Sequence, residues 1–152
     1  MKIRIEIDEQ QPEEIVIHCH RQDETVNRLL AAIGQVEGVP RELCLHVGNV
    51  EYYVSPDDIL FFETDGGKVY AHTRERMLET EHRLFELEQM LPYCFVRASK
   101  SAVVNVRPIA ALRRELTGNG EISFRNSDKH AYFSRAYYRL LRDKIEEVRF
   151  LK

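Results

Sequence analysis

The strongest constraint on this chain is a series of short segments, rich in β-branched and aromatic residues, that turn-forming residues separate. Four of them follow one another: LCLHV, VEYYV, DILFFE and KVYAHT. The separators are Gly48-Asn49, Pro56-Asp57 and Asp65-Gly66-Gly67, and residues of these types favour tight turns. The alternation predicts a β-meander with strands over residues 43–47, 50–54, 58–63 and 68–73.

The same pattern returns in the C-terminal part of the chain. We expect strands over residues 93–97, 101–106, 109–116, 121–125 and 130–133. Between the two sets of strands, Thr80 is expected to cap a helix of roughly twelve residues that ends at Pro92. Ser134 is expected to cap a closing helix with Tyr138, Leu141, Ile145 and Val148 on one face. The predicted fold class is therefore mainly β with helices (α+β), made of small antiparallel sheets.

Residues 1–36 are expected to form a separate, small strand-strand-helix unit. Apolar residues alternate over 2–8 and again over 13–19, which predicts a hairpin. Asp23 can cap a helix that ends at Gly34. A linker with Gly38 and Pro40 then leads to a second unit over residues 43–150.

The charge of the chain is unevenly distributed, and this distribution is more informative than the net value of −3. Residues 1–95 carry nine Lys and Arg against nineteen Asp and Glu, a net of −10. Residues 96–144 carry eleven against four, a net of +7. A basic third on an acidic protein is typical of a phosphate-contacting surface. Pairing of the basic part with the acidic part of the same chain is the alternative.

The sequence shows no signal peptide and no apolar run long enough to cross a bilayer, so we expect a cytoplasmic protein. Three cysteines, Cys19, Cys44 and Cys94, are too few for a disulfide framework and lack the CxxC spacing of a zinc site. We expect them to be buried or half-buried free thiols.

Two polar groupings invite a metal-binding or catalytic interpretation. His18 and His20 would point to one face of a strand, but no third ligand accompanies them, and a solvent-facing strand is the commoner meaning. Asp57 and Asp58 fall in a turn, where Asp routinely bonds its own backbone. Nothing resembles a nucleophile elbow, a GxGxxG motif or a P-loop. We therefore expect no catalytic residue, metal, cofactor or small-molecule substrate.

Two segments of the basic part call for a functional explanation. In residues 95–109, FVRASKSAVVNVRPI, polar and basic side chains interrupt an apolar run, which predicts a loop or bulge that holds donors outward. These side chains are Arg97, Ser99, Lys100 and Ser101. In the second segment, Arg135 follows Ser134 in the first turn of a helix, where a cation opposes the helix dipole. Such an Arg is interpreted as aimed at an anion.

Together these features resemble the LytTR DNA-binding domain over about residues 43 to 147. The resemblance rests on DILFFETDGGKVY, a Leu-rich amphipathic helix that ends near Pro92, FVRASKSAVVNVRPI, a Gly-Asn-Gly hairpin and the closing Ser134-Arg135 helix. The N-terminal unit is similar to the small extension that a subset of short LytTR proteins carries in place of a phosphorylatable receiver domain.

The resemblance implies a protein that inserts loops, and no helix, into successive major grooves of bent double-stranded DNA at direct repeats in promoters. By position, the family's base-contacting sites fall on three loops, which here carry Lys68, Lys100 and Ser134-Arg135. Arg97, Ser99 and Ser101 are also expected to bind DNA, by positioning the backbone. Asn105 would fix local structure.

A sequence-specific DNA-binding transcription regulator is thus the leading hypothesis, with residues 1–36 serving a homodimer or a partner. The acidic helix at 81–91 is expected to face away from DNA. The alternative is an interaction module that docks a membrane or regulatory partner without binding DNA.

Overall fold

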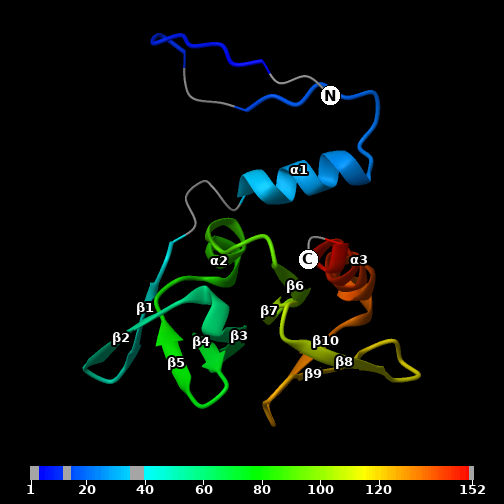
Figure 1. Cartoon of the computed structure of the whole chain (residues 1–152). Helices are drawn as coiled ribbons and strands as arrows, with labels where there is room; N and C mark the ends of the chain where they lie inside the picture. Colours follow the sequence, from blue (N-terminus) through cyan, green and yellow to red (C-terminus); the bar gives the residue numbers. More distant parts are fainter. Residues whose placement is uncertain (1–3, 12–14, 35–39, 151–152) are drawn as a thin grey trace.

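The computed structural model describes residues 4–11, 15–34 and 40–150 (Figure 1). Its large sheet is antiparallel, with strand order β2-β1-β5-β4-β3-β7-β6. The strands of this sheet are β1 (Leu43–Val47), β2 (Val50–Val54), β3 (Ile59–Asp65), β4 (Lys68–Thr73), β5 (Met77–Thr80), β6 (Phe95–Ser99) and β7 (Ala102–Asn105). A second sheet, β10-β9-β8, contains β8 (Ile109–Arg114), β9 (Gly120–Phe124) and β10 (His130–Phe133). The predicted fold class, mainly β with helices, is confirmed.

One apolar core joins the two sheets and the helices α2 (Leu84–Met90) and α3 (Tyr138–Phe150). On the large sheet, Phe61 and Phe62 are both buried and point to opposite faces because successive strand residues alternate. Phe61 stacks on Phe124 of the second sheet with ring centroids 5.5 Å apart. α2 packs against β3, β6 and β7, and α3 packs against β6 (Figure 1). The core therefore holds strands β3, β6 and β7, and the loops that follow them, in fixed positions.

The helix predicted to begin at Thr80 is shorter than expected. Residues 77–80 form strand β5, which pairs with β4, and Thr80 is buried at the end of that strand. Its hydroxyl accepts a hydrogen bond from the backbone of His82 at 3.2 Å, and α2 begins only at Leu84. The prediction that Thr80 caps the helix was wrong because pairing with β4, a contact from outside the segment, holds these residues extended.

The closing helix also differs at its start. A 3-10 turn, η2 (Arg135–Tyr137), comes first, and Ser134 stands before it without a side-chain capping hydrogen bond. The apolar face of α3 is as predicted, with Leu141, Ile145 and Val148 buried. Ser134 therefore marks the start of the turn but does not cap it.

The N-terminal unit is only partly as predicted. α1 (Glu24–Gly34) forms, and the carboxylate of Asp23 accepts a hydrogen bond from the Val26 backbone at 3.1 Å. The predicted hairpin lies partly outside the described residues, and residues 4–11 and 15–22 contain no strand. Ile5 and Ile7 are 81% and 90% exposed, so no core covers these two residues of the first predicted strand, and a two-stranded hairpin alone is marginally stable in water.

The cysteines are more exposed than expected, since Cys94 is buried but Cys19 and Cys44 are exposed. Within the described residues, no group of three His, Cys, Asp or Glu side chains could hold a metal ion. No helix in that part of the chain is long and apolar enough to span a membrane.

Candidate functional site

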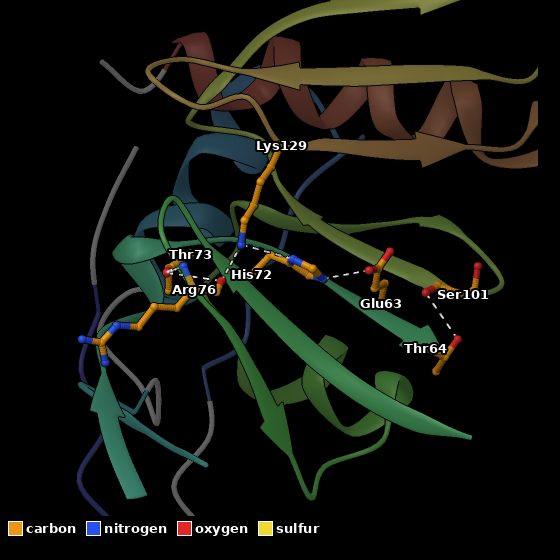
Figure 2. Close-up of polar contacts among 7 residues, drawn as sticks. All are labelled: Glu63, Thr64, His72, Thr73, Arg76, Ser101 and Lys129. Carbon is orange, nitrogen blue, oxygen red and sulfur yellow. Dashed lines mark hydrogen bonds and ion pairs between the residues drawn. The ribbon is translucent and has the colours of Figure 1, made fainter. Parts of the chain in front are cut away.

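Two of the three predicted loops lie side by side at one end of the large sheet. The pairing of Glu63 with Ala102, and of Ser99 with Ala102, brings the end of β3 and the β6–β7 turn together. The backbone N–H of Thr64 donates to the carbonyl of Ser101 at 2.9 Å. Figure 2 shows Thr64 and Ser101 facing each other at this end of the sheet.

The third loop, at η2, is attached to the same end. The backbone N–H of Ser134 donates to the carbonyl of Ala98 on β6 at 3.0 Å. The backbone N–H of Arg135 donates to the side-chain oxygen of Asn119 at 2.9 Å. The β3–β4 turn, the β6–β7 turn and η2 thus form one continuous surface, here called the loop edge.

The first loop is a tight two-residue turn between Asp65 and Lys68. Gly66 and Gly67 both have positive φ, 57° and 82°, as the type I′ turn that matches the twist of a hairpin requires. The ammonium of Lys68 lies 3.5 Å from the carboxylate of Glu79 on β5. Lys68 is exposed, but its charge is partly balanced by Glu79.

The second loop is organised by Arg97. Its guanidinium donates to the carbonyls of Ser99 at 2.7 Å and of Lys100 at 2.6 Å, and forms an ion pair with Glu88 at 2.9 Å. The register shift between Arg97 and Ser99 confirms the predicted bulge. Within the loop, the hydroxyl of Ser99 accepts a hydrogen bond from the Ser101 backbone at 3.2 Å. Arg97 and Ser99 therefore shape the turn that presents the exposed side chain of Lys100.

The third loop presents Arg135. The residue is exposed, and its aliphatic stem passes over Gly118 of the β8–β9 turn so closely that a Cβ there would lie 2.8 Å from the Arg135 Cγ atom. Gly118 has φ +89°, a conformation that favours glycine. The β8–β9 turn thus holds the backbone of Arg135 through Asn119 and its stem through Gly118.

Lys100 and Arg135 are the uncompensated cations of the loop edge. Eleven ion pairs occur within the described residues, and neither side chain takes part in any of them. Lys68 and Arg97, in contrast, each face a carboxylate. The two free cations can therefore bind an anion without first breaking an internal contact.

A buried histidine contacts polar side chains of β3 and of the β9–β10 turn behind the loop edge (Figure 2). His72 of β4 is 8% exposed and stacks on Phe61 with ring centroids 4.3 Å apart. Its Nε2 lies 2.7 Å from Glu63, and its Nδ1 lies 3.4 Å from the ammonium of Lys129. Burial lowers the pKa of His72 despite the nearby carboxylate, so the ring is neutral and donates from Nε2 to Glu63 while Nδ1 accepts from Lys129.

Three supporting features were not predicted from the sequence. Asn119 was expected only to form part of a hairpin turn, although it binds the backbone of Arg135. Arg114 lies over the ring of Tyr138 at 4.1 Å, which adds a cation next to η2. Glu88 of the acidic helix forms an ion pair with Arg97, which places one carboxylate of that helix next to the second loop.

Similarity to known proteins covers most of the chain. Residues 50–146 match the family model described as "LytTr DNA-binding domain". An uncharacterized HTH-type transcriptional regulator of Staphylococcus aureus (strain bovine RF122 / ET3-1) is 28% identical over 95% of this chain and 98% of its own length. A regulator with the same description from S. aureus (strain NCTC 8325 / PS 47) is 27% identical over the same shares.

A solved structure has the same fold. It is a LytTr DNA-binding domain from Bacillus cereus, with a TM-score of 0.64 and 22% sequence identity. The similarity covers 70% of this chain and 97% of that domain.

Proposed function

We propose that this chain binds promoter DNA through the loop edge. The chain belongs to the LytTR DNA-binding domain family and is a DNA-binding transcription regulator. The observation that supports this proposal is that Lys100 follows β6 and Arg135 lies on the loop that is hydrogen-bonded to β6, with both side chains exposed and free of ion pairs within the described residues. DNA carries closely spaced phosphates, and cations that neutralise them release counterions.

Loops, and no recognition helix, would enter the groove. The relatives' description names a helix-turn-helix, whereas strands separate every two successive α-helices in the described part of this chain. We propose that Lys100 and Arg135 contact guanine edges or phosphates, because both side chains donate to the guanine O6 and N7 acceptors in the major groove. Lys68 would add a weaker contact, since Glu79 competes for its ammonium.

The other predicted residues would act on the loops. Arg97 holds the carbonyls of the second loop, and Ser99 and Ser101 are bonded within it. Ser134 anchors the third loop to β6. We propose that these four residues set the register of the protein on the DNA, whereas the two free cations supply most of the affinity.

Binding to a DNA fragment selected from the source genome tests the proposal. Lys100→Ala and Arg135→Ala are each expected to weaken binding by at least about 1 kcal/mol, measured by fluorescence anisotropy. If a variant loses a phosphate contact, the slope of log K against log salt falls by roughly 0.9. Arg83→Ala is the matched control, because Arg83 is exposed at the start of α2 and its side chain has no hydrogen bond or ion pair within the described residues.

Two results would contradict the proposal. One is unchanged DNA affinity of both variants with intact folding. The other is an Arg83→Ala variant that loses as much affinity as they do, because binding would then depend on overall charge and not on the loop edge.

A homodimer is a second proposal, and the exposed apolar residues of the N-terminal segment support it. Ile5, Ile7, Ile15 and Val16 are all more than half exposed. Covering such residues against a second copy would bury apolar surface. Light scattering of wild type and of Ile5→Asp/Ile7→Asp tests this, and a wild-type monomer at all concentrations would exclude it.

Docking to a membrane partner stays a prediction of the sequence. We propose that the protein acts in the cytoplasm, where bacterial promoter DNA lies.

A further inference from the structure

The end of the large sheet opposite the loop edge carries a second set of basic residues that the proposed function does not use. β4 runs from Lys68 at the loop edge to Thr73 at the far end, where β3 starts and β7 ends. Figure 2 shows this separation, with Thr73 and Arg76 at one end and Thr64 and Ser101 at the other. The basic residues at the far end are Arg74, Arg76, Arg107, Arg125 and Lys129.

Three of these arginines line an open cleft of about 310 Å³, here called the far cleft. Its lining comprises Asp57, Arg74, Asn105, Arg107, Pro108, Arg125 and Asn126. The volume lies at the lower limit of the range in which proteins bind small molecules. Apart from Asn105 at the end of β7, these residues come from four separate connections of the fold, so the cleft is built by tertiary structure and not by a run of basic sequence.

Two arginines of the far cleft, Arg74 and Arg107, are held in place by neutral groups. Arg74 donates from Nε to the carbonyl of Arg125 at 3.2 Å, and Arg107 donates from Nη2 to the hydroxyl of Tyr93 at 3.2 Å. The guanidinium of Arg107 also lies over the Tyr93 ring, 5.6 Å from its centroid. None of Arg74, Arg107 and Arg125 forms an ion pair within the described residues.

Apart from Pro108, the remaining lining residues are polar and suit a ligand that is more than a bare anion. Asp57 adds a carboxylate, which accepts hydrogen bonds from hydroxyl or amino groups. Asn126 has φ 56° and is the one non-glycine residue with positive φ in the described part of the chain. Such conformations concentrate at ligand-binding positions.

We propose that the far cleft binds a small phosphate-bearing molecule of the nucleotide class, separately from DNA. Guanidinium groups match the geometry of phosphate oxygens, and three of them around one cleft favour a doubly charged phosphate monoester. Asp57 accepts a hydrogen bond from a hydroxyl or amino group of the same molecule. A concave site favours a small ligand over a DNA backbone, which needs an extended surface.

Calorimetric titration of the full chain at low ionic strength tests this, with AMP as the probe, adenosine as its uncharged counterpart and pyrophosphate as the phosphate-only probe. Wild type is expected to bind AMP saturably, adenosine at least tenfold more weakly, and pyrophosphate detectably. Arg74→Ala/Arg125→Ala should weaken AMP binding at least tenfold, whereas the control Arg83→Ala should not. Amide NMR shifts at Arg107 and Asn126 on addition of AMP to wild type locate the site without a variant.

Three outcomes would overturn the inference: no saturable binding of AMP or pyrophosphate, AMP binding that the double variant leaves intact, or AMP shifts confined to the loop edge. Loss of promoter binding by the double variant, with no phosphate-probe binding to wild type, would assign the far cleft to DNA instead. Because the proposed function depends on Lys100 and Arg135, its failure is read from those variants and is independent of this titration.

Discussion

Arg97 donates a 2.6 Å hydrogen bond from its guanidinium to the main-chain carbonyl of Lys100. The same group bonds the carbonyl of Ser99 and pairs with Glu88. A cation predicted from the sequence to contact DNA is thus occupied within the protein. Its effect on DNA would be exerted through Lys100, whose position it fixes.

Arg97→Ala is therefore expected to act differently from Lys100→Ala. It should lower the free energy of unfolding by about 1–2 kcal/mol, because two carbonyls lose a charged donor at a partly exposed site. DNA affinity should also fall, but the salt slope should stay at the wild-type value because no phosphate contact is lost. Urea denaturation and anisotropy over a salt series measure both effects. A slope reduced as much as in Lys100→Ala would instead make Arg97 a direct phosphate contact.

Gly118→Ala should disturb the third loop. The new Cβ would lie 2.8 Å from Cγ of Arg135, and the residue has φ +89°, so both backbone and side chain must adjust. We expect a stability loss of about 1–3 kcal/mol and weaker DNA binding. Gly48→Ala is the matched control, since Gly48 has φ +58° but no atom within 4 Å of the position that an added methyl group would take. Equal DNA affinity of the two variants would show that Gly118 does not position Arg135.

Most strands could be predicted because their signals are local. Residues 43–47 and 50–54 form β1 and β2 with the predicted bounds, since alternating apolar residues and a Gly48-Asn49 turn are enough to specify a hairpin. β5 was not predicted, because residues 77–80 become a strand only by pairing with β4 and β1. Thr80, at the end of this segment, was therefore interpreted as a helix cap.

The loops of the candidate site could be predicted from motif order, but their internal contacts could not. The side chain of Arg97 donates a hydrogen bond to Glu88, nine positions earlier in the sequence. The backbone N–H of Arg135 donates one to Asn119, sixteen positions earlier. Neither spacing corresponds to a helical turn or a strand repeat, so only the tertiary structure brings these residues together. The sequence therefore identified the cations but not which of them remain free.

The three thiols should differ in reactivity. Cys19 and Cys44 are exposed, whereas Cys94 is 1% exposed and burial raises the pKa of its thiol, which keeps it protonated. A thiol reagent such as DTNB should modify two cysteines rapidly in the native protein and the third only on unfolding. Cys94→Ala should leave the fast phase unchanged. Three fast equivalents in native wild type would mean that the core around Cys94 opens readily.

His72 links stability to pH. Its folded pKa lies below the ordinary value of 6.5, with burial as the main cause and Lys129 acting in the same direction. The unfolded chain therefore takes up a proton at a higher pH than the folded one. The stabilisation from neutral His72 is complete above about pH 6.5 and is lost as the pH falls toward the folded pKa.

His72→Phe should remove this part of the pH dependence. Phenylalanine can retain the stack on Phe61 but does not titrate, and the other histidines are common to both proteins. Below about pH 6.5, wild type should lose stability faster than the variant, by at most about 1.4 kcal/mol per pH unit. Urea unfolding at a series of pH values from about 8 down to about 5 measures the difference. Parallel curves for the two proteins would mean that the pKa of His72 is the same in the folded and unfolded states, with Glu63 offsetting burial and Lys129.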